Sequence, residues 1–441
     1  MSVAGGEPRR NVIRRALTAA TRAASPSSAI ARCCRLMGDV LEIGAETRID
    51  LAGFARTVVV GAGKATPVLA AAFSDLAGAR VAGGTIATKD GHGVPLPFDL
   101  WEAGHPIPDA RSLAAAAEAL LTARSLTPND LLVCLLSGGA SALWTAPAAG
   151  LTLRDVQRTT DALLRSGAPI DELNAVRKHL SRIAGGQLAR TSGAGRIVTL
   201  AISDVLGDRP DVIGSGPTVP DPTTFADAIR IIRSRGAAVP SSVAHHLQLG
   251  LAGAVEETPK PGEPLWRRSS YHIVASLADA LPAAAASLEA DGYLVSIETA
   301  ELTGEAREAG SLIAASAIDA ATGGAEPRRA LLWGGETTVQ VRGRGKGGRN
   351  QEMALAAALE LSGRRDIVVA CFGTDGTDGP TDAAGGFADG STAQRARAAG
   401  VDPRDALARN DSYACLSAAE DLIVTGPTGT NVNDIAIALV G

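Results

Sequence analysis

The sequence predicts an α/β protein of two domains, the first of them built on a parallel sheet. Short apolar runs typical of buried strands, such as 57–60, 131–136 and 366–372, alternate with Ala- and Leu-rich runs typical of helices. Several strand-like runs end in glycine-rich turns, and 441 residues is a usual length for two domains. The turns recur at no fixed period, which excludes a repeat protein.

The N-terminal half alternates predicted strands with predicted helices. The helices are expected over 10–24, 27–37, 153–164 and 173–188, with two more beginning near Pro67 and Ser112. The strands are expected over 57–60, 83–88, 131–136 and 197–202. Such alternation is typical of a parallel sheet whose strands are joined by helices.

The alternation resumes in the second half. Strands are expected over 271–275, 293–297, 330–333, 337–342, 366–372 and 422–425, and helices over 276–290, 304–320 and 351–361. Between the halves, residues 246–264 are rich in Pro, Gly and Glu, as linkers often are. We therefore predict an N-terminal domain over 8–245, a linker over 246–264 and a C-terminal domain over 265–441.

The overall composition limits the possible partners. The formal net charge is −5, from 42 basic and 47 acidic side chains, which argues against a nucleic-acid surface covering the protein. No apolar run approaches the roughly 18–20 residues that cross a bilayer. The five cysteines form no CxxC pair, which favours a reducing compartment. We expect a cytoplasmic monomer or homodimer that binds small molecules, with neither nucleic acid nor membrane as a partner.

One basic, glycine-rich segment lies between a predicted strand and a predicted helix. It contains Arg342, Arg344, Lys346 and Arg349, separated by glycines and followed by Asn350. Glycines allow backbone N–H groups to turn toward a ligand, and a helix begins with partial positive charge. The segment therefore predicts a site for a multiply charged anion such as phosphate. A flexible basic loop without a ligand is the competing interpretation.

The predicted strand 57–60 ends in a second candidate site. Gly61 and Gly63 form a turn before a helix, as in nucleotide-binding βα units, although the third glycine of GxGxxG is absent. Lys64 at this turn could meet an anion that the turn holds. An exposed lysine near a helix start, which the helix dipole mildly disfavours, is the alternative.

Two further strand ends carry polar residues. Ser137, Gly138 and Gly139 follow the apolar strand 131–136, where backbone N–H groups could bind phosphate or carboxylate. Asp204 follows the strand 197–202 at the position where open α/β sheets place ligand residues. It could hold a metal or orient a hydroxyl, or it could be a turn residue.

A glycine-rich loop with several acids follows the strand 366–372. Asp375 and Asp378 in this loop suit a hard cation such as Mg²⁺, because carboxylate oxygens are its preferred protein ligands. The spacing is not that of an EF-hand. Turn formation alone could also explain these Asp and Gly residues.

Together these segments resemble the glycerate 2-kinase family, the two-domain glycerate kinases with a C-terminal MOFRL domain. The matching stretches are VVVGAGKAT (58–66), GHPIPD (104–109), LLSGGASAL (135–143), NAVRKHLSRIAGGQLA (174–189), ISDVLGDRPDVIGSGPTVPDPTT (202–224), GGETTVQVRGRGKGGRNQE (334–352), FGTDGTDGPTDAAGG (372–386) and GPTGTNVNDI (426–435). They span nearly the whole chain in the order of the family.

The resemblance implies a Rossmann-like N-terminal domain, a MOFRL-type α/β domain and an active site in the cleft between them. It also implies transfer of the ATP γ-phosphoryl group to the 2-hydroxyl of D-glycerate, with a divalent cation such as Mg²⁺. The functional Lys, Asp and Arg of the family correspond to Lys64, Asp204 and Arg349. Lys64 and Arg349 would neutralise phosphate oxygens, and Asp204 would orient or deprotonate the acceptor hydroxyl.

Two other functions compete with this interpretation. Family members have been labelled hydroxypyruvate reductase, an NAD(P)H-dependent activity. Against it, the Gly61 turn lacks the third glycine, and Asp75 does not end a convincing second strand as a ribose-binding acid would. A non-catalytic sugar-acid or nucleotide binder is the second alternative, and it would gain nothing from carboxylates beside phosphate without a metal.

Overall fold

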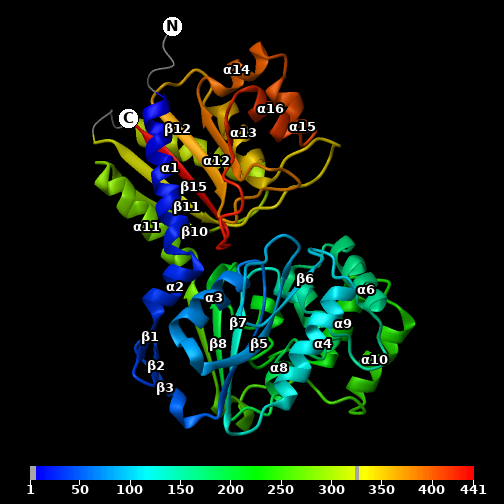
Figure 1. Ribbon diagram of the computed structural model, residues 1–441. Helices are drawn as coiled ribbons and strands as arrows, with labels where there is room; N and C mark the ends of the chain where they lie inside the picture. Colours follow the sequence, from blue (N-terminus) through cyan, green and yellow to red (C-terminus); the bar gives the residue numbers. More distant parts are fainter. Residues whose placement is uncertain (1–5, 323–326) are drawn as a thin grey trace. The chain divides into compact units, whose positions relative to one another are not determined.

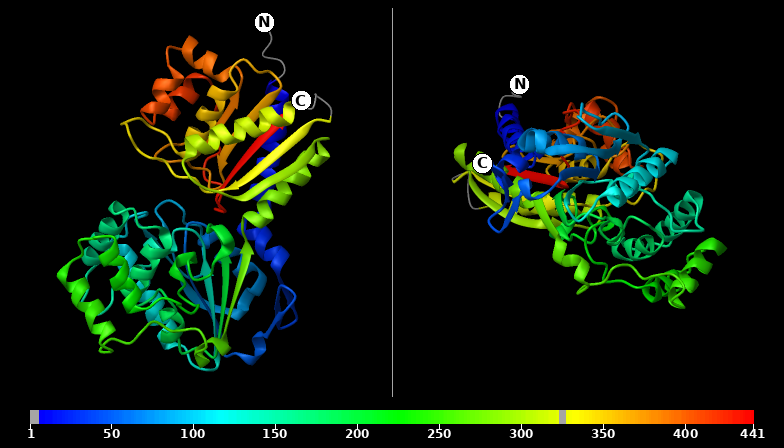
Figure 2. Two further views of the ribbon diagram at one scale, coloured as in Figure 1. Left: turned by 180° about the vertical axis from the view of Figure 1, so that it is seen from behind. Right: turned by 60° about the horizontal axis from the view of Figure 1, so that its bottom comes forward.

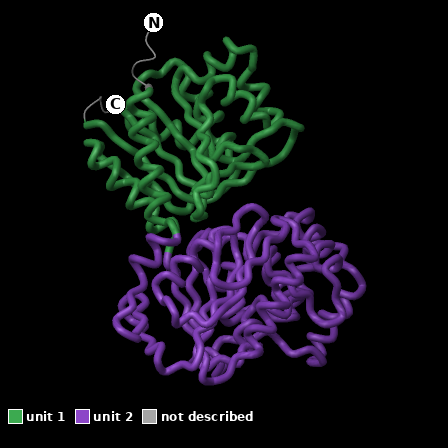
Figure 3. The backbone as a smooth tube through the Cα atoms, viewed as in Figure 1, with its two compact units in different colours: residues 1–25, 275–441 green, residues 26–274 purple. Residues whose placement is uncertain are grey.

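The computed structural model describes residues 6–322 and 327–441 (Figure 1). The chain forms two compact units, one of residues 26–274 and one that combines residues 1–25 with 275–441 (Figure 3). We call them unit 2 and unit 1. The predicted domain ranges differ from these units at both ends. The predicted linker is an integral part of unit 2, since 241–251 is helical and Thr258 Oγ1 donates to the buried Asp221 carboxylate at 2.9 Å.

Unit 2 is built on a six-stranded sheet in the order β6-β5-β4-β7-β8-β9. Its strands are β4 (Arg56–Ala62), β5 (Val81–Lys89), β6 (Asp99–Ala103), β7 (Asp130–Leu136), β8 (Arg196–Ile202) and β9 (Ser269–Ala275). The pairs from β6 to β8 are parallel, which confirms the predicted parallel sheet. From β4 the chain proceeds to β5 on one side, and from β7 to β8 on the other. The topological switch point, where open α/β sheets bind ligands, therefore lies between β4 and β7.

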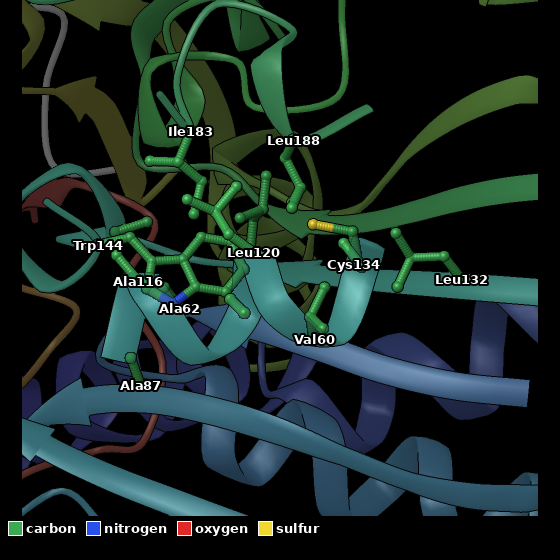
Figure 4. Close-up of a cluster of buried hydrophobic side chains, with 14 of the residues drawn as sticks. Val60, Ala62, Ala87, Ala116, Leu120, Leu132, Cys134, Trp144, Ile183 and Leu188 are labelled. Carbon is green, nitrogen blue, oxygen red and sulfur yellow. The ribbon is translucent and has the colours of Figure 1, made fainter. Parts of the chain in front are cut away.

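Helices cover both faces of this sheet. Unit 2 contains α2 (Pro26–Cys33), α3 (Thr66–Ala77), α4 (Ala110–Ser125), α5 (Ala140–Leu143), α6 (Leu153–Arg165), α7 (Ile170–His179), α8 (Gln187–Thr191), α9 (Phe225–Ser234) and α10 (Ser241–Leu251). One core cluster joins the central strands to α4, α5 and α8 (Figure 4). In it the fully buried Val60 and Leu132 of the sheet lie with Leu120 of α4 and Trp144, which are almost fully buried.

Two smaller parts complete unit 2. Strands β1 (Cys34–Met37), β2 (Val40–Ile43) and β3 (Thr47–Asp50) form an antiparallel meander. Helices α6, α7, α9 and α10 share a separate apolar cluster that includes Leu163, Leu173 and Phe225. This second cluster holds α6 and α7 beside the carboxyl edge of the parallel sheet.

Unit 1 contains a mixed sheet in the order β10-β11-β15-β12-β13-β14. Its strands are β10 (Leu294–Leu302), β11 (Arg329–Gly335), β12 (Ile367–Gly373), β13 (Gly385–Asp389), β14 (Leu422–Ile423) and β15 (Asp434–Val440). The last strand of the chain, β15, is fully buried and pairs antiparallel with both β11 and β12. This central strand brings Asp434 between the ends of its two neighbours.

The helices of unit 1 form a layer on each face of the sheet (Figures 1 and 2). They are α1 (Gly6–Ala23), α11 (Leu277–Ala290), α12 (Ala306–Ala321), α13 (Arg349–Glu360), α14 (Thr392–Ala398), α15 (Pro403–Ala408) and α16 (Ser412–Ala418). Helices α12 and α13 pack on the face that carries Trp333 and Val369. Helices α1 and α11 pack together on the other face, where Leu277 contacts Gly334.

Three predicted elements differ from the structure. The helix predicted over 27–37 ends at Cys33, where β1 begins. The helix predicted over 173–188 is interrupted after His179, because the chain leaves helical geometry at Leu180 and Ser181 forms a bridge with Pro147. The next helix, α8, begins only after the left-handed Gly185 and Gly186. The strand predicted over 337–342 is an irregular loop, and the strand that precedes it is β11.

Across the two described ranges, every helix is too short or too polar to cross a bilayer. The cysteines are free thiols, and Cys134 and Cys371 are fully buried in the central strands β7 and β12. They serve there as small apolar side chains.

Candidate active site

The turns after β4 and β7 are bound to each other at the switch point. The N–H of Lys64 donates to the Gly138 carbonyl at 2.9 Å. Gly63 has a φ of 141°, and a Cβ atom there would lie only 2.1 Å from Ser137 Oγ. A glycine is therefore required at Gly63 by both conformation and space. Its role is to let the two turns approach each other.

Ser137 and Gly61 have structural roles that the predicted phosphate contacts do not explain. The buried Ser137 hydroxyl accepts from the Ala65 N–H at 3.0 Å and bonds to Thr66 Oγ1 at 2.8 Å, while the Ser137 N–H donates to the Ala62 carbonyl. Gly61 lies inside β4, where a Cβ atom would be 2.6 Å from the Leu135 carbonyl oxygen. Both residues pack the sheet end together, and these roles account for them without a phosphate contact.

Gly138 and Gly139 fit the anion-binding prediction better. Within residues 6–322 and 327–441, neither of their N–H groups donates to a protein acceptor. Gly139 is left-handed, with a φ of 89°, and begins the short helix α5. A Cβ atom at Gly139 would lie 3.0 Å from the His105 ring and 3.6 Å from Lys64 Cγ. The two N–H groups, Lys64 and His105 thus surround one small space.

Asp204 lies at the same edge of the sheet. It is the second residue after β8, which neighbours β7, and its side chain is partly exposed. Parallel strands end at one edge, so Lys64, Gly139 and Asp204 occupy successive strand ends of β4, β7 and β8. The structure therefore places three of the residues that the sequence predicts for unit 2 at one edge of the sheet.

In unit 1, Arg349 is the first residue of α13 and is held by two carboxylates. Its Nε and Nη2 donate to the two oxygens of Asp434 at 2.5 and 3.0 Å, and its Nη1 donates to Glu336 at 2.7 Å. Burial opposes the charge of Arg349, but Asp434 and Glu336 outweigh it and raise the pKa of the guanidinium. Burial also acts to raise the pKa of Asp434 while Arg349 lowers it. The bidentate geometry supports the ion pair.

Asp378 caps α13, and this role does not favour the predicted metal contact. Its two oxygens accept from the N–H groups of Asn350 and Gln351 at 3.1 and 2.9 Å. The N-cap residue Gly348 has no side chain, and Asp378 lies so close that a Cβ atom at Gly348 would be 2.3 Å from its Cγ. Asn350 is also buried against this carboxylate, which leaves it no surface for the predicted phosphate contact.

The basic loop does not form the predicted backbone cradle. The N–H groups of Arg342 and Gly343 donate to Asn410 Oδ1, and that of Lys346 donates to Asp411. A Cβ atom at Gly343 would lie 2.2 Å from the Arg409 carbonyl oxygen. The glycines therefore allow the loop to pack against residues 409–412. The side chains of Arg342, Arg344 and Lys346 remain exposed.

Asp375 keeps a partly exposed carboxylate. It accepts from the N–H and the hydroxyl of Thr377, both at 3.0 Å, which is an Asx-type turn. The part of the chain that the structure describes contains no group of three or more His, Cys, Asp or Glu side chains arranged to hold a metal. The donor set fits at most a cation that brings most of its own ligands.

The chain is similar to known families over most of its length. Residues 12–248 match a domain of unknown function (DUF4147), and residues 329–434 match the MOFRL family. A D-glycerate 2-kinase of Thermotoga maritima is 41% identical over 87% of this chain and 91% of its own length. A glycerate 2-kinase of Pyrococcus horikoshii is 43% identical over 96% and 95%.

The chain belongs to the glycerate 2-kinase family.

Structural similarity agrees with this assignment, and two relatives carry another name. The crystal structure of a glycerate kinase from Thermotoga maritima has a TM-score of 0.85 and 38% identity, covering 99% of this chain and 100% of that one. Two proteins of Agrobacterium vitis named putative hydroxypyruvate reductase are 44% and 45% identical, each over 88% of this chain and over 100% and 87% of their own lengths. The predicted family and both predicted α/β folds are confirmed. The cleft site implied by the family resemblance stays a prediction.

Sequence reasoning about this glycerate 2-kinase family member missed three residues. Two of them hold Arg349. Asp434 follows the polar loop 426–433, and Glu336 follows the strand β11. His105, at the Gly139 turn, directly follows β6 and Gly104. Each of them lies just beyond or at a strand end, and that position was the signal that could have identified them.

Proposed function

We propose that this protein is a glycerate 2-kinase. It would transfer the γ-phosphoryl group of ATP to the 2-hydroxyl of D-glycerate, giving 2-phosphoglycerate and ADP. The observation that carries the proposal is the identity of 41–43% to two glycerate 2-kinases over almost all of each protein. The cation, free N–H groups and carboxylate at the strand ends of unit 2 support it chemically.

Phosphoryl transfer depends on positioning and on charge stabilisation more than on covalent catalysis. We assign Lys64 and the N–H groups of Gly138 and Gly139 to phosphate oxygens, since cations and oriented N–H groups stabilise the charge on the migrating group. We assign Asp204 to the acceptor hydroxyl, which it would orient and deprotonate as a general base. The adjacency of β4, β7 and β8 supports this division of roles.

Arg349 would act as an oriented cation. Its contacts with Asp434 and Glu336 use three of its five N–H groups, which leaves two donors for phosphate oxygens. The two carboxylates fix the plane of the guanidinium, so the remaining donors point in a defined direction. The exposed Arg342, Arg344 and Lys346 would add attraction for anionic substrates.

We propose Mg²⁺ as the companion of ATP. The ion would neutralise charge on the nucleotide phosphates, and it commonly takes only one or two carboxylates from a protein. Asp375 is the acid we assign to it, because Asp378 is committed to the helix cap. The partly exposed Asp375 carboxylate fits a cation that arrives with the nucleotide.

We propose that the enzyme acts in the cytoplasm on small molecules, with neither nucleic acid nor membrane as a partner. The fully buried thiols of Cys134 and Cys371 are consistent with a reducing compartment. For the oligomeric state we keep monomer and homodimer as the two candidates, which light scattering separates.

Hydroxypyruvate reductase, the activity in the names of the two Agrobacterium relatives, is the function that competes with glycerate 2-kinase. In dinucleotide-binding folds an acid at the end of the second strand binds the ribose. In this chain Lys89 ends β5, and the following Asp90 is paired with Arg111 at 2.5 Å. The turn after β4 also lacks the third glycine of that fingerprint.

One experiment separates the two activities. Purified protein is assayed for ADP release with ATP, Mg²⁺ and D-glycerate, and in parallel for NAD(P)H oxidation with hydroxypyruvate at 340 nm. We expect ADP release that depends on D-glycerate and no change in absorbance. Oxidation of NAD(P)H without ADP release would assign the protein to the reductases.

A further inference from the structure

A cavity of about 590 Å³ lies within unit 2 beside the Gly138–Gly139 turn. Ser141, two residues after that turn, lines it, as does Pro106, which follows His105. Most of its wall is apolar and includes Trp144, Ile107 and Val156. The volume and the apolar lining are those of a pocket for an organic ligand larger than a phosphate.

One cation in this wall has no acidic partner. The only hydrogen bond of the Arg177 side chain within the described residues runs from Nε to Thr160 Oγ1, at 3.4 Å. Burial lowers the pKa of Arg177, and no carboxylate offsets this effect. By contrast, Arg235 at the C-terminal end of α9 is paired with Glu172. Asp161, an acid that lines the cavity, is paired with Arg165.

A half-buried guanidinium without a counter-ion loses hydration that nothing in the protein replaces. A ligand with π-electron density or negative charge would compensate for that loss. Arg177 occupies the last turn of α7, which is fixed by the apolar cluster of α6, α9 and α10. The cation is therefore held in place before any ligand arrives.

We propose that this cavity binds the nucleoside part of the phosphate donor, with Arg177 as its cationic contact and the phosphates extending to the Gly138–Gly139 turn. The inference rests on the proposed kinase function and assigns the nucleotide to unit 2. A purine has two apolar faces that match Trp144 and the aliphatic wall. Glycerate carries an oxygen on each of its three carbons. An apolar cavity of this size would strip the hydrogen-bonded water from these oxygens and offer no hydrogen bonds in return.

The test measures binding of ADP and of adenosine by titration calorimetry, without turnover. Thr160→Phe should fill the cavity, and Arg177→Met should remove the cation but keep an apolar stem. Arg158→Met on the exposed face of α6 is the matched control. We expect the Kd for ADP to rise at least tenfold in Thr160→Phe and severalfold in Arg177→Met. It should stay within twofold in the control, and adenosine should compete with ADP.

Different outcomes would overturn different parts of the account. If the KM for D-glycerate rises tenfold in both variants while the Kd for ADP is unchanged, the cavity holds the acceptor and the inference is wrong. If ADP binds but adenosine does not compete, the nucleoside lies elsewhere and the kinase function still stands. If the parent protein binds neither nucleotide nor nucleoside, both the inference and the proposed function fail. Thermal unfolding of each variant verifies that it is folded.

Discussion

Lys64 lies where the chain leaves the sheet at its switch point, and its backbone is fixed by the Gly138 carbonyl. A cation that stabilises the transition state should affect kcat far more than substrate binding. We predict that Lys64→Met lowers kcat by about 10²-fold or more, as does loss of comparable stabilising groups in other enzymes. Steady-state kinetics with ATP and D-glycerate measures this.

Lys89→Met is the control, because it removes another lysine from the same edge of the sheet, at the end of β5. Its kcat should stay within a few fold of that of the parent protein. Arg349→Met should resemble Lys64→Met. Near-normal turnover in both Lys64→Met and Arg349→Met would remove the catalytic roles assigned to them.

Asp378 and Asp375 lie three positions apart but have different surroundings. Asp378→Ala removes the acceptor for two N–H groups of α13, so it should lower the free energy of unfolding by about 1–2 kcal/mol without Mg²⁺ present. It should leave the Mg²⁺ concentration for half-maximal activity unchanged. Asp375→Ala should have the opposite profile, with little change in stability and a raised Mg²⁺ requirement. Urea unfolding and Mg²⁺ titrations measure both, and exchanged profiles would contradict the assignment.

At the scale of single residues, the sequence could identify groups at strand ends but not their partners. Lys64, Gly139 and Asp204 follow apolar runs that are plainly strands, and the structure places them at one edge. The Arg349–Asp434 pair joins residues 85 positions apart and exists only because β15 enters the sheet between β11 and β12. Pairing of that kind is non-local, so no local pattern records it.

At the scale of elements, Glu257 ties together helices that lie far apart in the sequence. Its carboxylate accepts from His179 Nε2 of α7 at 2.8 Å and from the Phe225 N–H, the first of α9, at 3.0 Å. Burial would raise its pKa, but these hydrogen bonds outweigh burial and lower the pKa of Glu257 to about 2. The charged form is therefore the one that stabilises the fold.

The sign of the pH dependence follows from that shift. A depressed pKa gives stability that is present above the unfolded pKa, about 4.3 for Glu, and is lost as the pH falls toward 2. Glu257→Gln should lower the free energy of unfolding at pH 7 by about 1 kcal/mol, a modest value because roughly a third of the side chain stays exposed. Urea midpoints of parent and variant should differ equally at pH 7 and 5 and converge below about pH 4. A difference that widens with acid would refute this role.

Helices and strands were predictable where burial alone decides them. The runs 131–136 and 366–372 became β7 and β12, which are buried throughout. The alternating run 337–342 did not become a strand, since Val341 is 79% exposed and the loop is held by Asn410. The helix predicted over 27–37 failed at Cys34, because the antiparallel register with Ile43 takes those residues into the meander.

At the scale of the whole molecule, unit 1 is assembled from both ends of the chain. Helix α1 packs against α11, β12 and β15, and its buried face includes Ile13 and Leu17. We predict that residues 275–441 expressed alone expose apolar surface and lack a cooperative thermal transition. Addition of a peptide of residues 6–25 should restore the transition.

A peptide with Ile13→Asp and Leu17→Asp is the control, and it should fail to restore folding because it would bury two charges. Cooperative unfolding of residues 275–441 without any peptide would show that α1 is dispensable, and would favour the division at 265 that the sequence suggested. Within 246–264, the Glu257 carboxylate accepts from the Phe225 N–H and the Thr258 hydroxyl donates to Asp221, so this segment is bonded within unit 2.

The most direct test of the proposed function identifies the product. Purified protein is supplied with ATP, Mg²⁺ and D-glycerate, and formation of phosphoenolpyruvate is followed with enolase, which accepts 2-phosphoglycerate directly. The account predicts a signal without added phosphoglycerate mutase, and its loss in Lys64→Met. A signal that requires the mutase would mean phosphorylation at the 3-hydroxyl and would contradict the role assigned to Asp204.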